Sequence, residues 1–201
     1  MANVDQRFGL RPVDHLLGLN WSDKVRRCFM TGASGAAYIG DAVDIAGSAD
    51  ASGAYPTIAP VTVGATRPIF GVIVGFEPDP ADLTLLYRKN STDRWALVCC
   101  DPFVIFEIQG DSSGVITKDM VGANAVLVGT HGGDTATGLS GMELYYTTTP
   151  AADATYQLLI LGASTRPDND ISLVNAKWNV LISLHRLGSI FSGAQAGWKG
   201  V

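Results

Sequence analysis

Apolar and polar residues alternate along several short runs of the chain. The clearest run is NAKWNVLISL, in which every second residue from Ala176 to Leu184 is apolar. A period of two residues places these side chains on one face of a strand, so the run predicts a strand with one buried face. The same rhythm recurs in residues 70–76 and 142–146. The pattern therefore predicts several strands.

Turn-forming clusters of Gly, Pro, Asp, Asn and Ser separate these runs at short intervals, for example at residues 46–56, 77–82 and 166–170. Helical signals are weak, and residues 79–88 and 117–125 are the best candidates for one or two helical turns each. This spacing predicts an all-β, mainly antiparallel fold. We expect a compact β-barrel or β-sandwich with at most one or two short helices and extended arms at both ends.

The two ends of the chain show neither period, which predicts three parts. Residues 1–27 form an N-terminal arm, residues 28–187 the barrel or sandwich domain, and residues 188–201 a Gly-rich C-terminal tail. We expect both ends to contact a partner, although the arm could instead fold back onto its own domain and complete the core, and the tail could simply fray. The residues predicted to bind a partner are Phe8, Leu10, Arg11, Pro12 and Val13 in the arm, and Phe191 and Trp198 in the tail.

Composition narrows the classes of partner. The net charge of -5 and the pI near 5.0 argue against broad binding to nucleic acid or to acidic membranes. Lys24, Arg26 and Arg27 form the densest basic group, which is typical of a solvated strand edge. No apolar run approaches the ~18 residues of a membrane span, and the N-terminus lacks the pattern of a secretion signal. Three cysteines, an odd number, fit a reducing compartment such as a cytosol.

The stretch WALVCCDPFVIFEIQGD is the first that resembles a chemical site. Alternation along a strand places Cys99 and Cys100 on opposite faces, so the two thiols cannot jointly bind one metal ion. No base can be assigned to either thiol, and we interpret both as small buried hydrophobic residues. Pro102 marks the end of a strand, and a second strand follows it. We expect Glu107 in that strand to face solvent or a subunit contact.

Two other chemical interpretations are weaker. TGASGAAYIG resembles the Gly-rich turn of short-chain dehydrogenases, but the helix that should follow it is missing. A pair of carboxylates for a hydrolase could be assembled from several turn residues, yet nothing in the sequence selects a pair. We therefore predict no catalytic residue, no metal site and no cofactor, and we expect the protein not to be an enzyme. A hydrolase on a β scaffold stays open as a third candidate.

The order of several short motifs is more specific than any of them alone. FGLRPV, YIGDAV, FGVIVGFEPDPADLTLLYR, FEIQGDSSG, GLSGMEL, LLIL and RPDNDISLVNAKWNVLIS follow one another between about residues 8 and 185. In this order the chain resembles the capsid decoration, or cement, proteins of tailed bacteriophages. The aromatic tail after Leu187 matches none of these motifs.

The resemblance implies a noncatalytic virion protein that sits on the outer surface of an icosahedral head and is assembled in the host bacterial cytoplasm. It implies two partners, the major capsid protein, whose subunits it bridges, and other copies of itself, most often in a homotrimer. The alternative from another class is a carbohydrate-binding β-sandwich of a phage adsorption apparatus, which would present aromatic side chains and polar loops to a sugar.

Overall fold

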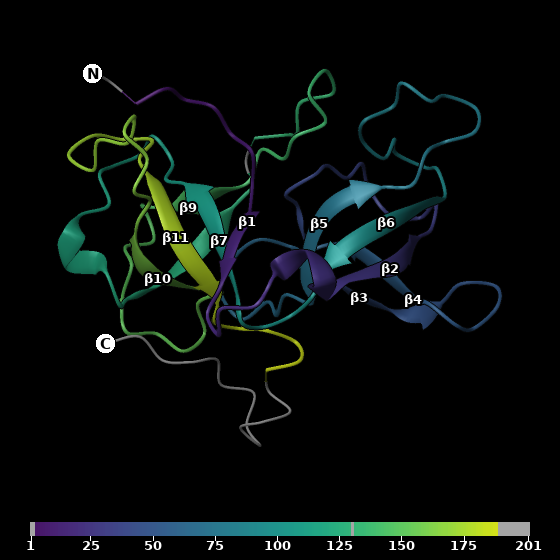
Figure 1. Cartoon of the computed structure of the whole chain (residues 1–201), viewed down its shortest axis with the longest axis horizontal. Coiled ribbons are helices and arrows are strands. Elements are labelled where there is room, and N and C mark those ends of the chain that lie inside the picture. Colours follow the sequence, from purple (N-terminus) through teal and green to yellow (C-terminus); the bar gives the residue numbers. More distant parts are fainter. Residues whose placement is uncertain (1–2, 130, 189–201) are drawn as a thin grey trace.

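The computed structural model describes residues 3–129 and 131–188, which form eleven strands and two short 3-10 helices (Figure 1). The elements are β1 (Arg11–His15), η1 (Trp21–Lys24), β2 (Val25–Met30), β3 (Ala42–Ala49), β4 (Pro56–Pro60), β5 (Gly71–Phe76), β6 (Arg94–Cys99), β7 (Val104–Gln109), η2 (Lys118–Met120), β8 (Asn124–Val128), β9 (Glu143–Tyr145), β10 (Leu158–Ala163) and β11 (Lys177–Ile182). Among the named strands described here, only β2 and β4 pair in parallel. The predicted all-β, mainly antiparallel fold is confirmed.

Five strands close into a barrel in the order β2-β4-β3-β5-β6, with β6 paired back to β2. Alternate residues of each strand point into the barrel. Cys28, Met30 and Val98 are among the fully buried side chains that fill it, together with Ile58 and Ile73. Closure gives each barrel strand a partner on both sides, so the backbone groups of these strands pair within the barrel.

The other six strands form one sheet in the order β1-β7-β11-β10-β8-β9. β1 is therefore an edge strand that pairs with β7. At the other edge, Leu144 of β9 forms an isolated bridge with Gly110, directly after β7. The sheet thus curls back toward its own start, and Trp178 of β11 is 1% exposed in the core that results.

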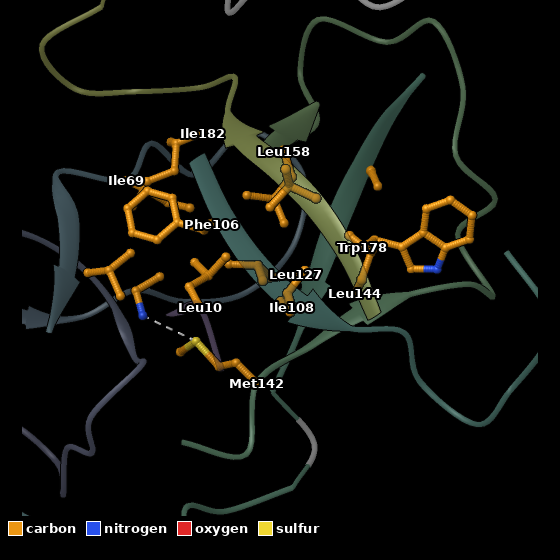
Figure 2. Packing of buried hydrophobic residues seen from close by; sticks show 14 of the residues in the cluster. Leu10, Ile69, Phe106, Ile108, Leu127, Met142, Leu144, Leu158, Trp178 and Ile182 are labelled. Carbon is orange, nitrogen blue, oxygen red and sulfur yellow. Dashed lines mark hydrogen bonds between the residues drawn. The ribbon is translucent and has the colours of Figure 1, made fainter. Parts of the chain in front are cut away.

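One hydrophobic cluster, the shared core, joins the barrel to the sheet, while a second cluster, the barrel core, fills the barrel. In Figure 1 the sheet lies on the left and the barrel on the right. Phe106 of the sheet and Leu10, from the segment before β1, lie in one buried cluster (Figure 2). Ala42 and Val72 of the barrel belong to the same cluster. The backbone N–H of Ala42 also donates to Sδ of Met142 at 3.4 Å, across the boundary. Burial of apolar side chains therefore holds the barrel and the sheet together.

The strands expected from the alternating runs are present. The run ending at Leu184 contains β11, residues 70–76 contain β5, and residues 142–146 contain β9, which confirms these three strands. The expectation of one buried face is wrong for β11, because Lys177 and Leu181 on its other face are also buried. A single 3-10 turn, η2, lies within residues 117–125, where a short helix was expected. Residues 25–27, which the sequence groups with the arm, form the first half of β2.

Residues 79–88 form turns and not the helical turns expected from the sequence, so this prediction is wrong. The Asp82 side chain accepts the backbone N–H of Thr84 at 3.2 Å, which favours a turn over a helix. The buried guanidinium of Arg94 donates a hydrogen bond to the carbonyl oxygen of Leu85 at 2.9 Å. These side chains satisfy backbone groups that a helix would otherwise pair with each other.

Candidate functional site

The N-terminal arm is built into the sheet through β1. Arg11 lies opposite Glu107 in the register of β1 and β7, and its guanidinium forms an ion pair with that carboxylate. Ser164 donates its hydroxyl to the other oxygen of Glu107 at 2.5 Å. Glu107 is 2% exposed, so the expectation that it faces solvent or a subunit is wrong. Its partners come from β1 and from the segment after β10, and local sequence does not reveal them.

A polar network fastens the residues before β1 to the same sheet. Glu143, which is 1% exposed, accepts from Arg7 Nε at 3.1 Å and from Gln109 Nε2 at 3.0 Å. The Gln109 side chain also donates to Asp5 at 2.8 Å and accepts the backbone N–H of Gln6 at 3.0 Å. Because the carboxylate is buried and hydrogen bonded from two directions, this part of the arm has a fixed path.

The arm then crosses the loop before β3 at two glycines. The backbone N–H of Leu10 donates to the carbonyl oxygen of Gly40 at 2.9 Å, and Gly9 lies against Gly40 and Ser140. Leu10 is 1% exposed and belongs to the shared core (Figure 2). The Leu10 side chain, for which the sequence predicts a partner contact, completes the core of its own chain.

An apolar pocket of about 310 Å³ opens beside this crossing. Its walls come from the arm, from η1, from the loop before β3, from β5 and from the loop before β9. The lining residues are Phe8, Leu10, Arg11, Pro12, Trp21, Ile39, Gly40, Ile73, Val74 and Leu139. Segments of four motifs, FGLRPV, YIGDAV, FGVIVGF and GLSGMEL, thus meet at one place. The Arg11 guanidinium lies 4.8 Å from the centre of the Phe8 ring.

Beyond the pocket, the chain presents a row of exposed apolar side chains, which we call the arm surface. Its members are Val13 (41% exposed), Leu16 (45%), Leu17 (63%) and Leu19 (51%). Four large apolar side chains within seven residues form an unusual density for solvent-facing positions, and such patches mark interaction sites.

The turn that carries the arm surface is held by hydrogen bonds. The backbone N–H of Leu16 donates to the carbonyl of Phe103 at 2.9 Å, and that of Leu17 donates to Nδ1 of His15 at 3.1 Å. His15 is 3% exposed, and its Nε2 lies 3.5 Å from the Asp101 carboxylate. The leucines are thus displayed from a fixed base and need little further ordering to bind.

His185 holds a turn in the same way as His15, also at the junction between barrel and sheet. Its Nδ1 accepts the backbone N–H of Leu187 at 3.0 Å, and the residue is 4% exposed. Burial lowers the pKa of His185 to about 4, against a smaller opposing effect of Asp101. The imidazole is therefore neutral at pH 7, and its role in this geometry is to fix a turn.

The three cysteines are free and buried, which confirms the interpretation of Cys99 and Cys100 as core residues. Cys99 belongs to the shared core and Cys100 to the barrel core, on opposite faces of the strand end as expected. Burial raises the pKa of Cys28 to about 11 and that of Cys99 to about 12, so both stay protonated at pH 7. Within residues 3–129 and 131–188, no three His, Cys, Asp or Glu side chains are placed to hold a metal ion.

The outer face of the barrel carries a second feature, an aromatic patch. The Arg27 guanidinium lies 3.6 Å from the centre of the Trp95 ring and forms two hydrogen bonds, of 2.6 and 2.9 Å, with the Glu77 carboxylate. Phe29 and Tyr55 flank Trp95, with ring centres 4.8 and 5.2 Å away. The patch is partly exposed, and Arg27 belongs to it rather than to a solvated basic edge.

The residues predicted to bind a partner thus do not form one site. Phe8, Arg11 and Pro12 line the pocket, and Val13 lies on the arm surface. Phe191 and Trp198 lie outside the described residues. The residues that sequence reasoning missed as binding candidates are Leu16, Leu17 and Leu19 on the arm surface, and Trp21, Ile39, Val74 and Leu139 in the pocket. The aperiodic leucines were a usable signal for the surface, whereas the pocket residues follow no local pattern.

A scan against models of known protein families matches none of them. Searches of curated proteins and of solved structures find no match either. In the part of the chain that the structure describes, no helix has the length and apolar character needed to cross a bilayer.

Proposed function

We propose that the protein is a structural component of a tailed-bacteriophage head, which binds the outside of the coat lattice and bridges major capsid protein subunits. The arm surface is the single observation that carries this proposal. It supplies a compact set of exposed apolar side chains for which the described part of the chain provides no cover. The order of the sequence motifs supports the same class of protein.

A cement protein has to bind without rearranging the coat it stabilises. The arm surface fits that requirement, because Leu16 and Leu17 are held by backbone hydrogen bonds to Phe103 and His15. Full burial of one leucine is worth about 1.5–3 kcal/mol before ordering costs. Several copies linked to each other can then bind a lattice firmly although each arm surface is small.

The proposal is tested with coat-protein heads assembled without this protein. Leu16→Ser, Leu17→Ser and Leu19→Ser combined should leave the fold intact and reduce co-sedimentation with heads by at least about tenfold, the factor that each 1.4 kcal/mol gives. Leu83→Ser with Leu86→Ser is the matched control, because both leucines are exposed, at 78% and 50%, on the loop between β5 and β6.

The wild-type protein and the control should decorate heads at a copy number comparable to that of the coat protein. If the unaltered protein fails to bind such heads and is missing from purified virions, the proposal is rejected. If the triple variant binds like the wild type, the arm surface is not the contact.

The aromatic patch favours a second candidate function, recognition of a glycan. Sugars stack their C–H faces on aromatic rings, and their hydroxyls bind charged side chains such as Arg27 and Glu77. Under this candidate, Trp95→Ala would abolish retention on host surface polysaccharide, while Leu17→Ser would not change it. Equal retention of wild type and Trp95→Ala would remove the candidate.

A further inference from the structure

We propose that the apolar pocket between the arm and the barrel is the binding site for the C-terminal segment of this protein, residues 189–201, with Phe191 or Trp198 as its anchor. This inference concerns how copies of the chain, or the two ends of one chain, hold each other. It stands whether or not the protein binds a phage head.

The pocket has the character of a site for an aromatic side chain. Phe8, Trp21 and Leu139 contribute apolar walls, and the volume is about 310 Å³. The one charged group in the lining, Arg11, is already paired with Glu107 and lies over the Phe8 ring. An occupant therefore has to be apolar and needs no countercharge.

The described chain ends beside η1, whose first residue lines this pocket. The backbone of His185 forms an isolated β-bridge with Ile69, and Arg186 forms an ion pair with Asp44. These two contacts fix the place where the C-terminal segment begins. Leu187 packs against the barrel core and lines a neighbouring depression together with Asp23 and Lys24 of η1. Trp21, at the start of the same 3-10 helix, lines the apolar pocket.

The C-terminal segment is long enough to reach the pocket from the end of the described chain. A four-residue 3-10 helix such as η1 spans only about 8 Å. Trp198 lies ten positions after Gly188, and an extended chain of that length spans about 35 Å. The segment can therefore reach the pocket of its own chain or that of an adjoining copy.

The sequence of the segment fits the pocket chemically. SIFSGAQAGWKGV has two aromatic residues, Phe191 and Trp198, and a single charged residue, Lys199. Its small residues allow the backbone to approach a wall closely, and its aromatic side chains provide large apolar area.

Disulfide trapping in the full-length protein tests the inference. Leu139→Cys places a thiol in the pocket wall, and Gly197→Cys places one beside Trp198 without removing the anchor. The control pair combines Gly197→Cys with Leu83→Cys, an exposed leucine that does not line the pocket. The native cysteines are buried and give little background. Val74→Cys, from another wall of the pocket, replaces Leu139→Cys if that variant misfolds.

We expect the pocket pair to cross-link on the order of tenfold more than the control pair, and Phe191→Ala with Trp198→Ala to abolish the difference. A monomeric or a dimeric product supports the inference equally and shows which copy supplies the segment. Equal yields for the two pairs, or a yield that the alanine substitutions leave unchanged, would overturn it.

Discussion

Gly9 lies directly against Gly40, so that a Cβ atom on either residue would overlap the backbone of the other segment. A Cβ on Gly9 would meet the Gly40 carbonyl oxygen, and one on Gly40 would meet the carbonyl oxygen of Phe8. Both residues also have positive φ angles, +67° and +95°. The crossing of the arm over the loop before β3 therefore requires glycine at both positions.

Gly9→Ala should lower the free energy of unfolding by at least about 2 kcal/mol, because it adds a backbone clash to the cost of a positive φ. Gly18→Ala is the matched control. Gly18 has nearly the same φ, +70°, but a Cβ there would have nothing within 4 Å. We expect the control to cost about 1 kcal/mol. Urea denaturation measures both, and equal losses would show that the close approach is unimportant.

Deletion of residues 2–13 should destabilise the protein, because it removes most of β1 and the buried Leu10. Leu10→Ala tests the core contribution separately, with an expected loss of about 2–5 kcal/mol. Leu17→Ala, on the exposed arm surface, should change stability by less than about 0.5 kcal/mol. Thermal unfolding followed by circular dichroism gives the three values. A truncated protein as stable as the full chain would contradict the docking of the arm seen here.

Two buried groups should give stability opposite dependences on pH. The pKa of His185 falls from 6.5 to about 4 on folding, so its neutral form supports the fold above pH 6.5 and this support is lost as pH falls toward 4. Burial raises the pKa of Asp41 from 3.8 to about 6. Its ionised form weakens the fold above pH 6, and that penalty is relieved as pH falls toward 3.8. Each effect amounts to about 3 kcal/mol.

Substitution separates these two contributions. Between pH 6.5 and 4.5, His185→Asn should leave a protein that gains stability as pH falls, whereas Asp41→Asn should leave one that loses it. The wild type should change less than either variant. Urea midpoints measured at half-unit pH steps provide the comparison. Three parallel profiles would show that neither group titrates in this range.

The thiols should be inert in the folded protein. Because burial raises the pKa of Cys28 to about 11 and that of Cys99 to about 12, and the side chains are covered, a thiol reagent at pH 7 should react only on unfolding. All three thiols should become reactive in denaturant. Rapid labelling of Cys99 in the native protein would show that the junction between barrel and sheet opens readily.

Local periodicity was enough to predict β5, β9 and β11, because alternation is a property of consecutive residues. Trp178 and Val180 point into the core as their spacing predicts. Cys99 and Cys100 were correctly placed on opposite faces for the same reason. What the pattern does not contain is the partner of each strand, so it could not foresee the barrel order or the pairing of β1 with β7.

The candidate site was less predictable because its parts are distant in sequence. Glu107 looks like a solvent-facing charge until Arg11 and Ser164 are seen to cover it. Leu10 and Leu17 look alike in an aperiodic arm, yet one fills the core and the other is exposed. Only the path of the chain, which turns at Gly9, separates them.

The pairing of Arg11 with Glu107 also sets an order of events during synthesis. The two residues lie 96 positions apart, so the arm emerges from the ribosome long before its partner strand. At about 5–20 residues per second the interval is about 5–20 s. Long-range pairing of this kind also slows folding in general. Throughout that interval, Leu10 lacks the side chains of β7 to β11 that complete its core, so the newly made N-terminus stays exposed to premature association.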